Sequence, residues 1–184
     1  MDLRLHPTPA TLEEQAVVDA LLRSSAPERS EGLWHESRGG QAAAQARRHL
    51  LLPALQAVQA RVGWISPAAL GYICERLTIP PAEAYGVASF YALLALSPQP
   101  PVVLHLCEDL ACMVTGADNI RAELEHHFGP AGTPTADGRA TWHLSPCLGL
   151  CERAPAALCL VAGEQPREEA LAPTTAADLV QRLH

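Results

Sequence analysis

The chain has 184 residues, and its 13 basic and 20 acidic side chains give it a formal net charge of −7 without any Lys/Arg-rich patch, which excludes nucleic acid as an expected partner. Hydrophobic residues make up 48% of the sequence, which indicates a folded protein with a real core. The longest uncharged apolar run, Gly86 to Leu96, is shorter than the roughly 20 residues of a bilayer-spanning helix, so no direct membrane insertion is expected.

Residues 1–40 are expected to form an N-terminal extension with one short helix. Thr11 and Glu14 have the spacing of a capping box, in which each side chain satisfies a backbone N–H of the other residue. The apolar residues that follow recur on one helical face. Residues 24–40 mix Ser, Pro, Glu, Arg and Gly, a composition typical of a linker.

Residues 41–97 are predicted to form a small helical bundle. An Ala-rich first helix spans residues 41–61, and Pro53 within it predicts a kink or a restart of the helix. Ser66-Pro67 has the pattern of an N-cap followed by proline at the first helical position, and starts the second helix. A third helix is expected to begin near Pro81 and to include Leu94.

A second domain is predicted from residue 101 to residue 184, because the three prolines that follow Ser97 cannot continue a helix. The apolar run 102–106 is typical of a buried strand, and it delivers Cys107 at its carboxyl end, the end at which ligands gather in open α/β sheets. Further along we expect a helix at 118–128, strands at 140–144 and 156–161, and a final helix at 176–183. One more strand before the last helix is left open. This element order is that of a thioredoxin-like domain.

Four of the six cysteines lie in two short loops of this second domain. Cys107 and Cys112 are spaced C-x4-C, and Cys147 and Cys151 are spaced C-x3-C. Thiolates are soft anionic ligands that zinc and iron–sulfur units prefer over carboxylates. A [2Fe–2S] cluster is wider than a single ion and takes two thiolates per iron, so spacers of this length suit it; plant-type ferredoxins also begin with C-x4-C.

Spacing alone leaves other interpretations of these cysteines open. Structural zinc usually has C-x2-C pairs, although its spacers extend to four residues. A disulfide framework belongs to small secreted chains, and residues 1–7 lack the apolar run of an export signal. A thioredoxin-type dithiol needs C-x-x-C, which is absent here. Buried cysteines that only pack are the last alternative, and we expect this role for Cys74 and Cys159, which fall at apolar positions.

A set of motifs over residues 45–165 carries a resemblance to a known family. It comprises the two cysteine loops with Gly116-Ala117 and Ala154-Pro155, and in the N-terminal half Leu51–Leu55, Gly63-Trp64-Ile65 and Tyr85–Tyr91. Together they resemble the thioredoxin-like [2Fe–2S] subunit of NADH-quinone oxidoreductase (respiratory complex I). Relatives of that subunit serve NAD-dependent formate dehydrogenases and NAD-linked hydrogenases.

The resemblance implies an α+β chain, an N-terminal small helical bundle followed by a C-terminal thioredoxin-like α/β domain. Cys107 and Cys112 are expected to hold one iron of a [2Fe–2S] cluster, and Cys147 and Cys151 the other. Thioredoxin-like folds often have a cis-proline where Ala154-Pro155 stands, so we predict a cis bond there. Two departures from the pattern are the acidic pair Glu108-Asp109, expected to face solvent or basic groups of a partner, and a segment after Val161 without the usual aromatic residue.

The resemblance also implies a division of labour between subunits. The chain has no Rossmann fingerprint and no phosphate-binding glycine loop, so FMN and NAD are expected on a partner flavoprotein subunit, with further iron–sulfur subunits nearby. The chain is then an electron-transfer subunit that is not catalytic by itself, located in the cytoplasm or in a peripheral arm on the cytoplasmic side of a membrane. The alternatives are a stand-alone thioredoxin-like [2Fe–2S] ferredoxin and a zinc-stabilised adaptor domain.

Overall fold

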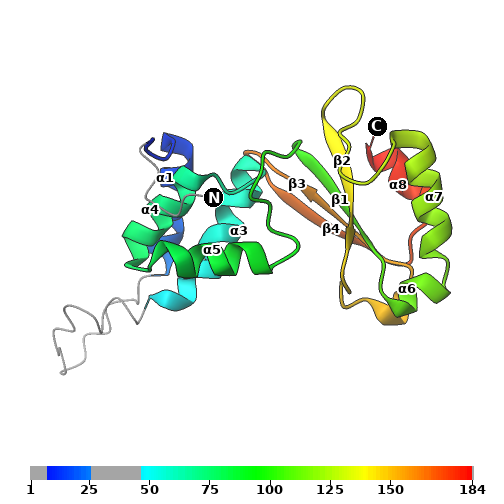
Figure 1. Ribbon diagram of the computed structural model, residues 1–184, viewed down its shortest axis with the longest axis horizontal. Helices are drawn as coiled ribbons and strands as arrows, with labels where there is room; N and C mark the ends of the chain where they lie inside the picture. The colour runs from blue at the N-terminus through cyan, green and yellow to red at the C-terminus, as the bar shows by residue number, and fades with distance from the viewer. Residues whose placement is uncertain (1–7, 26–46, 184) are drawn as a thin grey trace. The chain divides into compact units, whose positions relative to one another are not determined.

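A computed structural model describes residues 8–25 and 47–183 of the chain. The chain divides into two compact units, Met1–Ser97 and Pro98–His184. The first unit is helical, and the second combines a four-stranded mixed sheet with helices, so the predicted α+β class is confirmed (Figure 1). Residues 26–40 of the expected linker and the first residues of the helix expected from 41 lie outside the described part of the chain.

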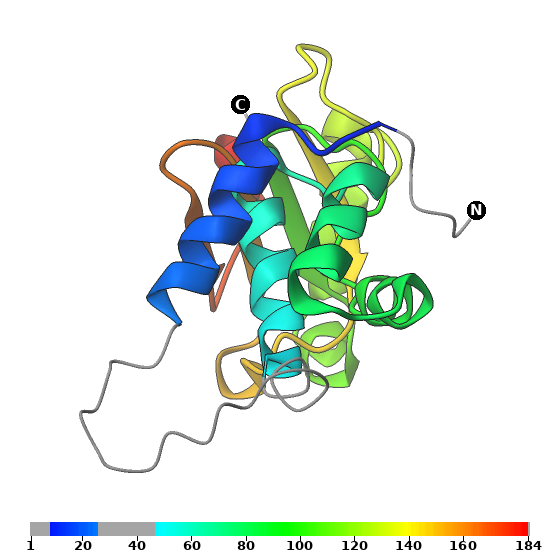
Figure 2. The ribbon, with the colours of Figure 1, turned by 90° about the vertical axis from the view of Figure 1, so that its left-hand side faces the viewer.

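The first unit is built from helices that share one buried core. They are α1 (Leu12–Ser24), the short 3-10 helix η1 (Arg48–Leu50), α3 (Leu51–Val62), α4 (Pro67–Leu77) and α5 (Pro81–Phe90). Val18 and Leu22 of α1 lie in the same core cluster as Leu55 of α3 and Ile73 of α4. Figure 2 shows α1 alongside α3. The helix assigned by the sequence to a separate extension is therefore an integral part of this bundle.

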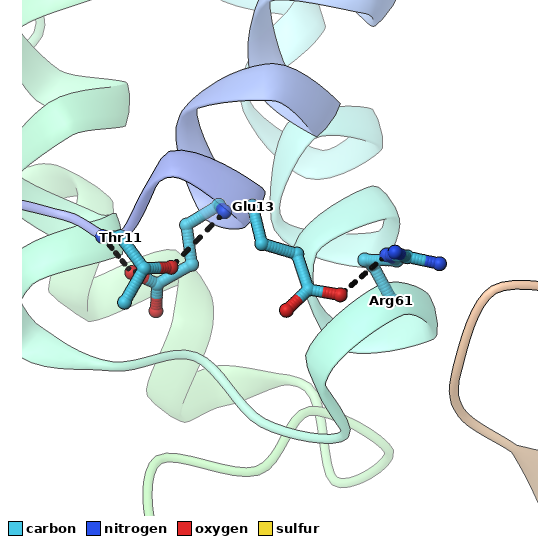
Figure 3. A network of polar contacts seen from close by, with 4 residues as sticks. Thr11, Glu13 and Arg61 are labelled. Carbon is cyan, nitrogen blue, oxygen red and sulfur yellow. Dashed lines mark hydrogen bonds and ion pairs between the residues drawn. The ribbon is translucent and has the colours of Figure 1, made fainter.

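The capping box predicted at the start of α1 is confirmed. The Thr11 backbone N–H donates to the Glu14 carboxylate at 2.7 Å, and the Glu14 backbone N–H donates to Thr11 Oγ1 at 3.2 Å. Glu14 is buried, and it also accepts a hydrogen bond of 2.6 Å from Ser66 Oγ at the N-cap of α4. Beside it, the ion pair Glu13–Arg61, 2.6 Å long, joins α1 to α3 (Figure 3). One carboxylate thus caps α1 and ties it to α4.

We expect Glu14→Ala to lower the free energy of unfolding of the first unit by about 2 kcal/mol, because it removes a cap and leaves buried hydrogen-bond donors without an acceptor. Glu13→Ala, which removes only a partly exposed ion pair, is the matched control and should cost at most about 1 kcal/mol. Urea unfolding followed by far-UV circular dichroism measures both. Equal losses in the two variants would contradict this role for Glu14.

Pro53 does not kink a helix. The helix α3 begins at Leu51 after η1, so Pro53 falls in the first turn, where a missing N–H leaves no intrahelical hydrogen bond unmade. The same helix ends at Gly63, whose φ of 92° is in the left-handed region that favours glycine. Of the two outcomes that the sequence left open, the structure shows the restart.

The helix α5 is shorter than predicted, because it ends at Phe90 and does not reach Leu94. A side chain on α3 holds the following segment in a non-helical path: Gln59 donates to Leu93 O at 2.5 Å and accepts from Ala95 N at 2.6 Å. The backbone of Ala95 also accepts a hydrogen bond of 2.8 Å from Ile65 N. These long-range bonds replace the helical ones that local periodicity predicts.

The second unit contains a sheet of order β2-β1-β3-β4. Its strands are β1 (Val102–Cys107), β2 (Ala140–Ser145), β3 (Ala157–Val161) and β4 (Arg167–Leu171). β1 pairs in parallel with β2 and antiparallel with β3, and β4 adds antiparallel to β3. The strand that the sequence left open is therefore present, as a largely exposed edge strand.

Helices α6 (Leu110–Val114), α7 (Ala117–Phe128) and α8 (Ala176–Leu183) complete the second unit. α7 and α8 pack against each other and against β1 (Figure 1), with Leu124 and Leu179 in the core. Among the described residues, the largest fully buried side chain is that of Trp142 in β2, whose Nε1 donates to Gly129 O at 3.1 Å. This core holds the strands whose carboxyl ends lead into the cysteine loops.

His105 is buried within β1, as expected of a core residue. It stacks on His143 of the neighbouring strand β2, with ring centroids 5.9 Å apart. Burial, together with the neighbouring His143, lowers the pKa of His105 to about 4, so this imidazole is neutral at neutral pH. It packs in the sheet as an uncharged ring.

The predicted cis bond at Ala154-Pro155 is confirmed, and Ala172-Pro173 is cis as well. These two loops lie together, because Thr174 N donates to Pro155 O at 3.0 Å. The Thr174 hydroxyl, however, is the only buried side-chain oxygen or nitrogen in the described residues without a hydrogen-bond partner. A buried hydroxyl that makes no hydrogen bond costs free energy.

We therefore expect Thr174→Val, which keeps the shape and removes the hydroxyl, to leave stability unchanged or to raise the free energy of unfolding by about 1 kcal/mol. Thr175→Val is the control: Thr175 Oγ1 accepts from Asp178 N at the start of α8, so its loss should destabilise by about 1 kcal/mol. Urea midpoints of the two variants should move in opposite directions, or only the second should move. A marked loss of stability in Thr174→Val would show that its hydroxyl is satisfied in solution.

Candidate metal centre

Two parallel strands place the two cysteine loops side by side. In the register of the parallel strands β1 and β2, Cys107 lies opposite Ser145, so both loops begin at the same end of the sheet, where these two strands have their carboxyl ends. The Glu108 backbone N–H donates to Ser145 O at 3.0 Å, and Cys107 N donates to Ala156 O at 3.0 Å. Both loops, and the start of β3, are therefore joined by backbone hydrogen bonds at the site.

The first cysteine pair is buried. Cys107 ends β1, and Cys112 lies on α6, a short helix that begins after Asp109. The sequence did not predict α6; its one local signal was Asp109, whose carboxylate accepts from Leu110 N at 2.7 Å. Burial, followed by the hydrogen bond to Cys107, raises the pKa of the Cys112 thiol to about 11.

The second pair is exposed. Cys147 and Cys151 lie in the loop after β2 and at the start of the 3-10 helix η2 (Cys151–Arg153), with their Sγ atoms 3.4 Å apart. The hydrogen bond to Cys147 raises the pKa of Cys151. Between them, Gly149 has a φ of 77°, and its N–H points to Cys147 Sγ at 3.5 Å. This turn aims a backbone dipole at a sulfur atom.

The two pairs also lie close to each other. The charge of Cys151 acts on Cys112, raising its pKa, and the charge of Cys107 likewise raises that of Cys151. Apolar side chains surround the buried pair, since Cys107 and Cys112 share a cluster with Ala117 and Ala156, against which Leu148 and Leu150 of the second loop pack. The structure thus gathers all four cysteines that the sequence singled out at one end of the sheet.

The donor set fits a two-iron centre. A [2Fe–2S] unit is held by two pairs of thiolates, one pair for each iron, and the site offers two pairs, each from its own loop. Within residues 8–25 and 47–183, no group of three His, Cys, Asp or Glu side chains is arranged to hold a metal ion, so the fit rests on the number and pairing of the thiols. The other two cysteines, Cys74 and Cys159, are buried in the cores of the two units, as predicted.

The charges around the site are mainly negative. Glu108 and Asp109 in the first loop and Glu152 in the second are exposed, as the departure from the family pattern at 108–109 led us to expect. Arg153 is the nearby cation of the second loop, and it lies 3.7 Å from Glu152. Negative charge beside a redox centre opposes the addition of an electron.

Gly149→Ala is expected to lower stability by about 1 kcal/mol, because the left-handed φ strains any residue with a Cβ. Gly86 in α5 is a matched control: a Cβ at either glycine would meet no atom within 4 Å, but only Gly149 has a positive φ. Gly86→Ala should raise the free energy of unfolding by about 0.5–1 kcal/mol through helix propensity. Urea titrations of the two variants measure both effects, and destabilisation of similar size in both would contradict the strain argument.

Together, the fold and the site define a thioredoxin-like domain with a four-thiol centre, preceded by a helical unit. The model of the thioredoxin-like [2Fe-2S] ferredoxin family matches residues 40–184, and the chain belongs to that family. The cofactor of this family is a [2Fe–2S] cluster, which agrees with the expectation from the motifs.

Subunits of NADH-quinone oxidoreductase from several bacteria are similar to part of this chain. The E subunit of NADH-quinone oxidoreductase from Pseudomonas aeruginosa is 35% identical over 106 residues, 57% of this chain and 64% of that protein. The Escherichia coli K12 protein of the same name is 34% identical over 105 residues, 56% of this chain and 63% of its own length. The match thus spans less than two thirds of these relatives.

Among solved structures, a chain of an NAD+-reducing [NiFe]-hydrogenase in the air-oxidised state has a TM-score of 0.54 with 25% sequence identity. The match covers 73% of this chain and 22% of the hydrogenase chain.

In the described part of our chain, no helix has both the length and the apolar character to cross a membrane.

Proposed function

We propose that the chain is the electron-carrying [2Fe–2S] subunit of an NAD-linked dehydrogenase complex. The observation that carries this proposal is that two parallel strands lead, at the same end of the sheet, into two loops that contain two cysteines each. Support comes from the family, and from relatives whose names are those of an NADH-quinone oxidoreductase subunit and an NAD+-reducing hydrogenase. The electrons come from, or go to, an FMN- and NADH-binding subunit.

Cys107 and Cys112 hold one iron in this proposal, and Cys147 and Cys151 hold the other. Each pair comes from one loop and has its two thiols in hydrogen-bond contact, which supports this pairing. When bound, a [2Fe–2S] cluster supplies reversible one-electron oxidation and reduction. The chain's own residues provide the thiolates, shield one pair from water and leave the other at the surface.

The surrounding residues set how easily the site accepts an electron. The N–H of Gly149 directed at Cys147 Sγ stabilises added negative charge. Glu108, Asp109 and Glu152 act in the opposite direction and lower the potential, while Arg153 offsets part of their effect. A low potential suits exchange with a flavin that is itself reduced by NADH.

Hydride chemistry belongs to the neighbouring subunit. The sequence has no Rossmann fingerprint or phosphate-binding glycine loop, so FMN and NAD bind to the partner flavoprotein, which converts two-electron hydride transfer into single-electron steps. Further iron–sulfur subunits carry the electrons onward. We place the assembly in the cytoplasm, as a peripheral arm where the parent complex is attached to a membrane.

Anaerobic purification of the chain tests the cofactor. We expect a red-brown protein with about two irons and two inorganic sulfides per chain, bleached by dithionite and restored by air. A colourless protein with one zinc would support the adaptor alternative.

Co-expression with the FMN-binding chain encoded by the same organism tests the partner. A stable complex between the two chains supports the subunit role, and the absence of a complex supports the stand-alone ferredoxin.

A further inference from the structure

Exposed apolar side chains gather on the helix that carries Cys112. In the described part of the second unit, the large hydrophobic residues that are exposed are Leu110, Met113 and Val114, and all three lie on α6. Leu110 is 74% exposed and Val114 is 84% exposed. Single exposed leucines and valines are common on protein surfaces, but three on one five-residue helix form a contiguous patch.

The patch lies on the exposed face of the helix that contains Cys112. Leu110 and Val114 are four residues apart and so share one face of α6, with Met113 beside them. Cys112 of the same helix points inward, where it is buried against Cys107 and lies near Cys151. Only the helix α6 itself therefore separates a molecule bound to the patch from the buried thiol of Cys112.

Acidic residues border the patch. Glu108 and Asp109 immediately precede α6 and are exposed. Glu152, also exposed, lies beside Cys151 in the second loop. The surface thus has an apolar centre and a mainly negative rim, in which Arg153 lies 3.7 Å from Glu152 and offsets part of its charge. It fits a partner with an apolar centre and a mainly positive rim.

We propose that Leu110, Met113 and Val114, with the acidic rim of Glu108, Asp109 and Glu152, form the docking surface for the chain's redox partner. The partner is a one-electron carrier protein that presents an apolar patch ringed by lysine and arginine side chains. This inference rests on the proposed function, in which the partner is the FMN-binding subunit. The apolar patch sets the distance of closest approach, and the acidic rim accelerates and orients the encounter.

Cytochrome c, a basic haem protein, is a suitable probe for this surface. In the reaction, one electron leaves the dithionite-reduced protein and converts one ferric haem to ferrous haem, with no proton transferred and no bond formed. Stopped-flow mixing of the full-length, cluster-loaded chain with cytochrome c gives the second-order rate constant. Ferricyanide, a small anion that needs no docking surface, reports the intrinsic reactivity of the same protein.

The double variant Leu110→Ser/Val114→Ser should reduce cytochrome c about tenfold more slowly, as expected when a central apolar contact is lost. Its rate with ferricyanide should not change, which also shows that the cluster is intact. Leu12→Ser is the matched control, because Leu12 is 85% exposed on the first unit, and it should leave both rates unchanged. An unchanged cytochrome c rate in the double variant, or an equal loss in Leu12→Ser, would overturn the proposal.

The acidic rim is tested separately with Glu108→Gln/Glu152→Gln. This variant should slow the cationic cytochrome c, accelerate the anionic ferricyanide and weaken the dependence of the cytochrome c rate on salt. Equal changes with both acceptors would speak against the rim. Failure of the proposed function gives a different result, since a chain without a cluster has no visible absorption band that dithionite bleaches.

Discussion

Cys112→Ser and Cys151→Ser are each expected to lose most of the bound iron and the visible absorption of the purified protein. A serine hydroxyl is a harder and far less acidic ligand than a thiol, so it does not replace a thiolate on iron. Loss of one ligand from either pair leaves that iron with a single protein thiolate, and the cluster as a whole with three. Iron and sulfide content per chain, together with the absorption spectrum after anaerobic purification, measure the effect.

Cys159→Ala is the matched control for these variants. Cys159 is buried in the same unit, in the core cluster of Trp142 and Leu124, but away from the four-thiol site. Its replacement should cost some stability and leave about two irons per chain. If Cys112→Ser or Cys151→Ser retained full iron, or if Cys159→Ala lost it as completely, the assignment of the four ligands would be wrong.

Trp142→Ala is expected to lower the free energy of unfolding of the second unit by about 3–5 kcal/mol. The side chain is fully buried in the core cluster of the second unit, and its removal leaves a large cavity in addition to the lost transfer free energy. It also leaves Gly129 O without its hydrogen-bond donor. Urea or thermal unfolding followed by far-UV circular dichroism measures the loss.

Trp142→Phe separates packing from hydrogen bonding at the same position. It keeps an aromatic ring and loses the Nε1–H donor, so we expect a smaller loss of about 1–2 kcal/mol. Because β2 leads into the loop of Cys147 and Cys151, Trp142→Ala should also shorten the lifetime of the visible chromophore during heating. A smaller loss for Trp142→Ala than for Trp142→Phe would show that the core closes around the gap.

The starts of α1 and α4 were predictable because the contacts that set them are local. Thr11 with Glu14 and Ser66 with Ala69 satisfy backbone donors three residues away, and the sequence contains both partners within one turn. The end of α5 was wrong because the competing contacts come from Gln59, more than 30 residues earlier. No periodicity within residues 81–94 contains that information.

The kind of site was also predictable, because the number of cysteines and the spacers between them are visible in the sequence and are typical of thiolate ligands to an iron–sulfur cluster. Their proximity depended on the parallel pairing of β1 with β2, which aligns Cys107 with Ser145 across more than 30 intervening residues. The short helix α6 escaped prediction, because five residues are too few to show helical periodicity. The exposed apolar face of α6, and with it the proposed docking surface, follows from the exposed fractions of its side chains, which only the tertiary structure sets.

By itself, the sequence determined which cysteines are the candidate ligands, the order of most helices and strands, and the N-caps of α1 and α4, since each depends on residue chemistry or on neighbours within a turn. The tertiary structure alone decided that α1 belongs to the helical core, that one cysteine pair is buried while the other is exposed, and that α6 exposes an apolar face. These features arise from contacts between segments distant in the chain, and such contacts are set by packing and strand register, which local patterns do not encode.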